Sequence, residues 1–129
     1  MTKVIRRSLS RAYMQAHMQI EVDENNEPIY VTFVSYRSPI ISIDLVDHTL
    51  YFYPTKVNYS RSTTKQTSCF ARDVLPDNMQ YYYLKQASVE KEINEMYVLD
   101  REVNYIRDQL KWFIEHGKNI KYWTSSGSD

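Results

Sequence analysis

The chain has 129 residues, a single-domain length that can bury one modest core. Its 43% hydrophobic and 25% charged residues are ordinary globular values, which exclude wholesale disorder. The formal net charge is zero and only two glycines occur, so we expect neither a general attraction to nucleic acid nor a glycine-rich phosphate loop.

A single cysteine, Cys69, excludes an internal disulfide and favours a reducing compartment, so we expect a cytoplasmic protein. No stretch has the apolar length of a membrane span, and the N-terminal residues lack the apolar segment of a signal peptide. The N-terminal segment is instead basic and carries no acidic residue before Glu21. Such an arm could contact phosphate, although a frayed, solvated terminus is the commoner meaning.

Four strands are predicted in the first half of the chain, and together they form an antiparallel meander. Residues 12–22 alternate strictly between apolar and polar, and the later runs are rich in β-branched and aromatic residues. Asparagine, aspartate and proline mark the turns at 23–28 and at Asp47-His48, and Pro54 ends the last strand. The predicted strands are 12–22, 29–36, 40–46 and 49–53.

A short helix is predicted over residues 63–75. Cys69, Phe70 and Val74 would lie on its inward side, and Ser60 or Ser62 could cap its first turn. We expect Cys69 to be a small core residue rather than a nucleophile.

A long C-terminal helix is predicted from an N-cap at Ser88 to Gly117, which we expect to end it in the left-handed conformation. Its apolar residues recur with the 3–4 spacing of a packed seam. At ~1.5 Å per residue the helix would reach roughly 40 Å, longer than a sheet of four strands is wide. The seam residues are Met96, Leu99, Val103, Ile106, Leu110 and Phe113.

Two interpretations of this seam stay open. The helix could pack along the sheet of its own domain, or it could project and join a second copy or a partner through the same residues. Fewer than four clean heptads favour the first interpretation. With residues 124–129 as a short polar tail, residues 1–123 are predicted to form a single α+β domain.

No catalytic, metal or cofactor signature occurs in the sequence. His17, His48 and His116 have no spacing typical of a zinc site, and no cysteine cluster accompanies them. We therefore expect a non-enzymatic protein without a cofactor.

The polar segment between the last predicted strand and the short helix is the candidate binding site. Hydroxyls and free amides at a helix N-terminus form a natural anion site, and flanking cations strengthen it. The alternative is that the hydroxyls only cap the helix while the cations pair with surface acids. The candidate partner- or anion-binding residues are Lys56, Tyr59, Arg61, Thr63, Thr64 and Lys65.

Four elements follow one another along the chain and together form one pattern. They are Ser35-Tyr36-Arg37-Ser38-Pro39-Ile40, Leu50-Tyr51-Phe52-Tyr53, Asn58-Tyr59-Ser60-Arg61-Ser62-Thr63-Thr64-Lys65-Gln66, and Phe70. This arrangement resembles a pattern of small phage and mobile-element proteins, in which an "SY-x-TP-[IV]" strand precedes a "YS-x-T-T-x-[KH]" turn and a helix that carries a phenylalanine. The resemblance spans roughly residues 33–72, about a third of the chain. Ser38 replaces the usual threonine, and the turn carries one extra residue.

The resemblance implies a phage-encoded accessory protein in a bacterial cell, and such proteins are often inhibitors of host defence, including anti-CRISPR proteins. The leading hypothesis is therefore a binding protein that inhibits or modulates a host protein or ribonucleoprotein through segment 56–65, with a possible homodimer through the C-terminal helix. The alternative is a nucleic-acid-binding protein that uses the same segment and the N-terminal arm, and its binding should weaken steeply with salt. An enzyme acting on a phosphorylated small molecule is a third possibility, supported only by the anion-site argument.

Overall fold

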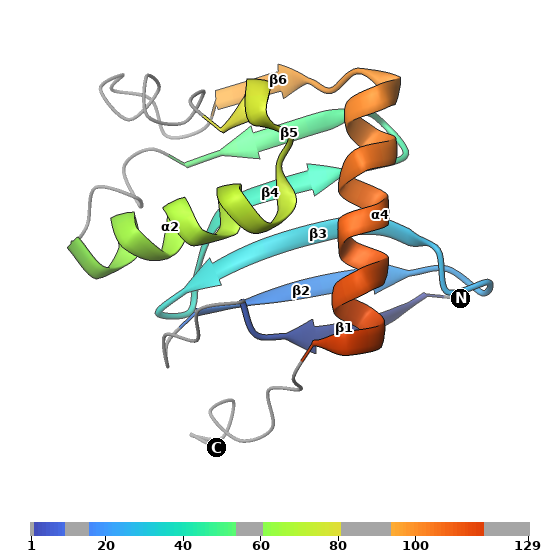
Figure 1. Ribbon diagram of the computed structural model, residues 1–129, viewed down its shortest axis with the longest axis horizontal. Helices are drawn as coiled ribbons and strands as arrows, with labels where there is room; N and C mark the ends of the chain where they lie inside the picture. The colour runs from blue at the N-terminus through green and yellow to red at the C-terminus, as the bar shows by residue number, and fades with distance from the viewer. Residues whose placement is uncertain (1, 10–15, 54–60, 81–93, 118–129) are drawn as a thin grey trace.

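The computed structural model describes residues 2–9, 16–53, 61–80 and 94–117, and of residues 61–64 and 94 it describes the backbone. An antiparallel sheet of six strands, in the order β1-β2-β3-β4-β5-β6, is covered on one face by two helices (Figure 1). The predicted α+β class with an antiparallel sheet is confirmed. The elements are β1 (Lys3–Arg7), β2 (Ala16–Val22), β3 (Pro28–Ser35), β4 (Ser38–Asp44), β5 (Thr49–Phe52), α2 (Arg61–Val74), the 3-10 turn η1 (Asp77–Met79), β6 (Asn94–Tyr97) and α4 (Asp100–His116).

The predicted number of four strands is wrong, because one further strand lies at each edge of the meander. At one edge, the basic N-terminal segment forms β1, which pairs with β2 from Lys3↔Val22 to Arg7↔Met18. The expectation of a frayed, solvated N-terminus is therefore also wrong for residues 3–7, which are paired in the sheet. β2 pairs with β3 on one side, and its other side is free to pair with β1. Exposed cations are common on edge strands such as β1, because they discourage pairing with a further strand.

At the other edge lies β6, whose residues the sequence pattern places in the C-terminal helix. Asn94–Tyr97 pairs with β5, with Leu50 opposite Met96, so tertiary pairing overrides the local helical pattern. The helix α4 begins only at Asp100, and Glu102 Oε1 accepts a hydrogen bond from the backbone N–H of Leu99 at 2.8 Å. The N-cap predicted at Ser88 lies outside the described residues.

The length of α4 matches the width of the sheet. Its 17 residues span ~25 Å, and six strands at a spacing of about 4.8 Å span ~24 Å. Figure 1 shows α4 crossing the strands from β6 to β1. The expected length of 40 Å is therefore wrong.

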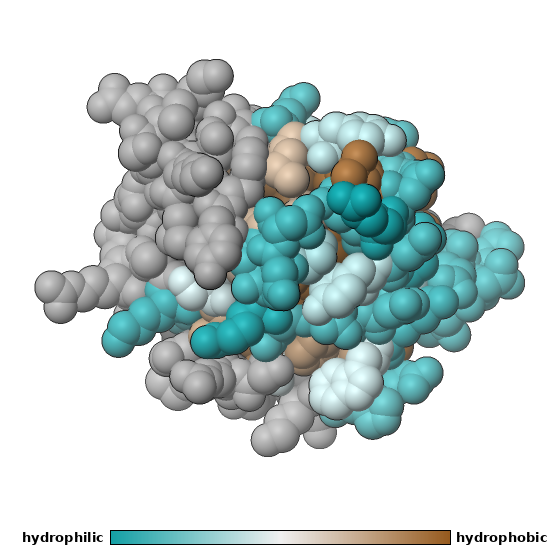
Figure 2. Space-filling view, turned by 45° about the horizontal axis from the view of Figure 1, so that its top comes forward, coloured by the Kyte–Doolittle hydropathy of each residue, from teal (hydrophilic) through white to brown (hydrophobic). Residues whose placement is uncertain are grey.

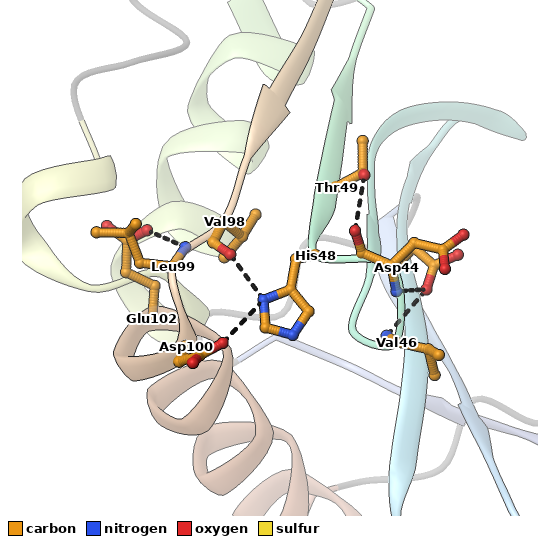
Figure 3. A network of polar contacts seen from close by, with 9 residues as sticks. Asp44, Val46, His48, Thr49, Val98, Leu99, Asp100 and Glu102 are labelled. Carbon is orange, nitrogen blue, oxygen red and sulfur yellow. Dashed lines mark hydrogen bonds and ion pairs between the residues drawn. The ribbon is translucent and has the colours of Figure 1, made fainter.

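The start of α4 is tied to the β4–β5 turn by His48. Its Nδ1 donates to the carbonyl of Val98 at 2.9 Å and lies 3.3 Å from Asp100 Oδ1 (Figure 3). His48 has a positive φ of 56°, as a tight turn at this position requires. In the same turn, Asp44 Oδ1 accepts hydrogen bonds from the backbone N–H groups of Val46 and Asp47. This confirms the turn predicted at Asp47-His48.

The core lies between the sheet and the two helices. In α2, Cys69, Phe70 and Val74 are buried, as predicted, and Phe70 stacks on Phe33 of β3 with ring centroids 5.1 Å apart. Ser35 donates to Gln66 Oε1 and joins the end of β3 to the same helix. On the face that Figure 2 shows, the described surface is largely hydrophilic and the hydrophobic residues lie mainly between hydrophilic ones.

The end of α4 differs in one respect from the prediction. Gly117 has φ −75° and ψ 160°, so it is extended and not left-handed. A glycine is still required, because a Cβ at this position would lie 2.5 Å from the carbonyl oxygen of Phe113. Residues 118–129, which include the predicted tail, lie outside the described part.

Among the residues that the structure describes, no helix combines the length and apolar composition that a membrane crossing needs.

Candidate functional site

The structure describes only part of the segment predicted to bind a partner or an anion. Lys56 and Tyr59 lie outside the described residues. Arg61, Thr63 and Thr64 lie in the first turn of α2, where the backbone alone is described, and Lys65 is exposed on the same helix. The binding role of this segment therefore stays a prediction.

The predicted helix seam is divided between two roles. Val103, Ile106, Leu110 and Phe113 are buried in the core of their own chain, so they are already covered and do not support a dimer. The two remaining seam residues precede α4. Met96 lies in β6 and packs partly against the core, whereas Leu99 is 42% exposed.

The face of the sheet turned away from α2 and α4 is polar. Side chains alternate between the faces of a strand, so the residues between the buried positions of each strand project to this open face. The strand register aligns them in two rows. One row is Arg6, Gln19, Thr32, Ser42, Tyr51 and Glu95, and the next is Val4, Glu21, Tyr30, Asp44, Thr49 and Tyr97.

A pocket of about 380 Å³ opens on this face, near the turn between β3 and β4. Its lining comes from four neighbouring strands and that turn. None of the described residues that line it is acidic. The lining residues are Arg6, His17, Gln19, Thr32, Val34, Arg37 and Pro39.

The turn beside the pocket has an unusual backbone. Tyr36 and Arg37 connect β3 and β4 with φ of 50° and 71°, the positive values that a type I′ hairpin turn requires. Asn-Gly is the usual choice for such a turn, and a residue with a Cβ in a sparsely populated conformation costs on the order of 1 kcal/mol or more. Tyr36 is also 45% exposed. The turn therefore holds an exposed tyrosine and an arginine at a cost in stability.

His17 forms the inner wall of the pocket and is 2% exposed. Burial, and next the charge of Arg6, lowers its pKa to about 4, so the imidazole is neutral at pH 7. Gln19 Nε2 lies 3.2 Å from His17 Nε2. An amide nitrogen can only donate, so Nε2 accepts and the ring proton is carried on Nδ1.

Two cations remain available in the pocket. Within the described part of the chain, the guanidinium groups of Arg6 and Arg37 have neither a hydrogen bond nor an ion pair. Some cations elsewhere are engaged: Arg107 donates to the carbonyl of Pro28, and Lys111 pairs with Glu27 at 2.8 Å. The pocket is therefore a region of uncompensated positive charge.

The opposite part of the open face is acidic. The pKa of Tyr51 is raised above its ordinary value. The largest cause is partial burial, and the nearby Glu95, Tyr30, Asp44 and Asp47 add to it. Glu21 lies in the same row as Asp44. The open face thus has a basic pocket at one end and a cluster of tyrosine and acidic side chains at the other.

No protein family matches the chain, and searches of the curated proteins and of the solved structures found no significant match. The pocket was missed at the sequence level because Arg6 and Arg37 lie on separate strands and meet only through the register of β1, β2 and β3. One signal pointed to the region: Ser35-Tyr36-Arg37-Ser38-Pro39, part of the resemblance to phage proteins, encodes the turn and one wall of the pocket.

Proposed function

We propose that this is a non-enzymatic binding protein that attaches to a protein partner through the open face of its sheet. The observation that carries the proposal is the Tyr36-Arg37 turn, which keeps an exposed tyrosine and a cation without a described partner in a costly backbone conformation. Strained backbone conformations cluster at functional sites, and tyrosine and arginine are among the residues that most often dominate binding energy at protein interfaces.

The charges of the open face favour a protein partner over nucleic acid. A phosphate backbone would be attracted by the basic pocket but repelled by Glu21, Asp44 and Glu95 on the same face. A protein surface can present complementary charges of both signs, which fixes its orientation. The nucleic-acid-binding alternative therefore depends on segment 56–65, of which residues 56–60 lie outside the described residues.

The class of partner follows from the resemblance of the sequence to phage accessory proteins. We propose a host protein or ribonucleoprotein in the bacterial cytoplasm, and inhibition of a defence complex, such as a CRISPR effector, as the effect of binding. Inhibition of this kind requires occupation of a surface and no chemical step.

A capture experiment with matched variants tests the proposal. The tagged chain is compared with Tyr36→Asn/Arg37→Gly, which replaces the turn by a sequence that suits its backbone, so lost binding cannot be ascribed to unfolding. Arg101→Ala/Tyr105→Ala removes the same residue types from the exposed side of α4. A bacterial protein should be retained by the wild-type chain and the α4 variant and lost by the turn variant.

Two outcomes would contradict this assignment. Equal retention by the turn variant and the wild-type chain would exclude the open face as the contact surface. Loss of the partner only in Arg61→Glu/Lys65→Glu would place the contact on the segment 56–65 instead. Nuclease treatment and a salt series of the captured complex separate a protein contact from one that nucleic acid mediates.

A further inference from the structure

We propose that the pocket between Arg6 and Arg37 receives a single oxyanion group of the protein partner, either the carboxylate of an acidic side chain or the phosphate of a modified serine. This inference rests on the proposed function and assigns the chemistry of one subsite within the open face. The pocket, and not the sheet as a whole, is the anion-binding element.

The first argument is electrostatic. Arg6 and Arg37 bring two like charges to the lining of one pocket, and none of the described lining residues is acidic. Their mutual repulsion is unfavourable, and an anion between them would relieve it. A guanidinium group presents several N–H donors in a planar fork that matches a carboxylate or a phosphate.

The second argument concerns hydrogen-bond donors in the lining. Ser42 Oγ donates to Thr32 Oγ1 at 3.4 Å, so the Thr32 hydroxyl still has its own proton to donate. The Gln19 amide uses one N–H for His17 and has a second. An oxyanion in the pocket would therefore meet neutral donors as well as the two cations.

The third argument concerns size and shape. A pocket of about 380 Å³ is at the small end of the range for ligand sites, and it suits one side chain better than a nucleotide. Val34 and Pro39 add apolar lining that can contact the aliphatic part of a glutamate. The tyrosine of the turn lies next to Arg37, where it can contact the backbone of the partner.

The test uses the full chain and three capped amino acids as probes: N-acetyl-glutamate N-methylamide, the matching phosphoserine, and the neutral glutamine. Side-chain N–H resonances of arginine and glutamine are followed by NMR during each titration. We expect saturable shifts at Arg6, Arg37 and Gln19 with glutamate or phosphoserine and none with glutamine. The tighter of the two anions identifies the source of the oxyanion.

Variants make the result specific. Arg37→Gln and Arg6→Gln should each weaken binding of the anionic probe by at least about tenfold, the effect of losing one charge-assisted hydrogen bond. Arg101→Gln, on the exposed side of α4, should leave it unchanged. Shifts that grow linearly without saturation, or that appear equally at Arg101, would overturn the inference.

The two proposals fail in different ways. If the capped glutamate binds but the turn variant still captures the partner, the subsite exists and the proposed function is wrong. If the turn variant loses the partner while neither anionic probe binds, the open face is the interface and the anion subsite is wrong.

Discussion

The guanidinium group of Arg7 in β1 caps the end of α4, donating to the carbonyl oxygen of Phe113 at 3.1 Å and to that of Ile114 at 2.9 Å. The carbonyl of Phe113 also accepts the backbone N–H of Gly117, whereas Ile114 is among the last carbonyl groups of the helix, which have no intrahelical partner. These groups carry the negative end of the helix dipole, so a cation there is favourable for both the hydrogen bonds and the charge. Partial burial lowers the pKa of Arg7 from its ordinary value. The Arg7 side chain thus joins β1 to the C-terminal end of α4.

Arg7→Met should lower the free energy of unfolding by about 1–3 kcal/mol, because the partly buried carbonyl groups of Phe113 and Ile114 lose a charged donor. Arg6→Met is the matched control, since the neighbouring side chain points to the other face and has no hydrogen bond to a described residue. Urea unfolding measures both variants. Equal losses would show that the contact between Arg7 and α4 contributes nothing specific.

Tyr36→Asn/Arg37→Gly should stabilise the protein by about 1–2 kcal/mol, because asparagine and glycine adopt positive φ at little cost. The same variant should lose the partner and the anionic probe. Thermal unfolding checks the first effect and the binding assays check the second. A destabilised variant would contradict the description of the turn as strained.

His17 should make the protein sensitive to mild acid. Its pKa is about 4 when folded and about 6.5 when unfolded, so between these values the unfolded chain binds more protons and stability falls as pH falls. We expect a loss of about 2 kcal/mol from pH 6.5 to pH 4, less than the full shift would give because His17 is half protonated in the unfolded chain at pH 6.5 and in the folded chain at pH 4.

Urea unfolding at pH 7, 5.5 and 4.5 measures this effect as the difference between the wild-type chain and His17→Gln. His116→Gln, which replaces an exposed histidine, should behave like the wild-type chain. If His17→Gln shows the same acid sensitivity as the wild-type chain, the low pKa of His17 does not govern it.

Ile106→Ala should destabilise the monomer by about 2–5 kcal/mol, because Ile106 is fully buried on the side of α4 that faces the sheet. Tyr105→Ala, at the neighbouring exposed position, should change stability by less than about 0.5 kcal/mol. The unfolding midpoint should not depend on protein concentration, whereas a dimer held by the seam would make it rise with concentration.

Local patterns were sufficient for the central part of the fold. The alternation that ends in Met18, Ile20 and Val22 produces a strand with one buried face, and Asn26 has a positive φ of 62° in the turn predicted at 23–28. The inward face of α2 follows in the same way from the spacing of Cys69 and Phe70. These features depend on neighbours in the sequence, so the sequence contains the information needed to predict them.

The edges and the site depend on distant pairing instead. Met96 fits the heptad of the helix and also the edge of β5, and only the pairing of Leu50 with Met96 decides between them. The pocket likewise needs Arg6 and Arg37 on one face, which requires the β1–β2 and β2–β3 registers together. A shift of one residue in either register would turn Arg6 to the opposite face.

The crossing of α4 over the whole sheet has a consequence for the order of folding. The strands pair with their neighbours in sequence, whereas Arg7 and Phe113 are 106 positions apart. Local hairpins can close early, but docking of α4 on β1 must wait for contacts between residues that are far apart in the sequence, which slows the final step. Until then the part of the apolar face that α4 covers is exposed to water, so a chain still in synthesis depends on α4 to become resistant to aggregation. Pulse-labelled hydrogen exchange should show protection of β2, β3 and β4 before protection of α4.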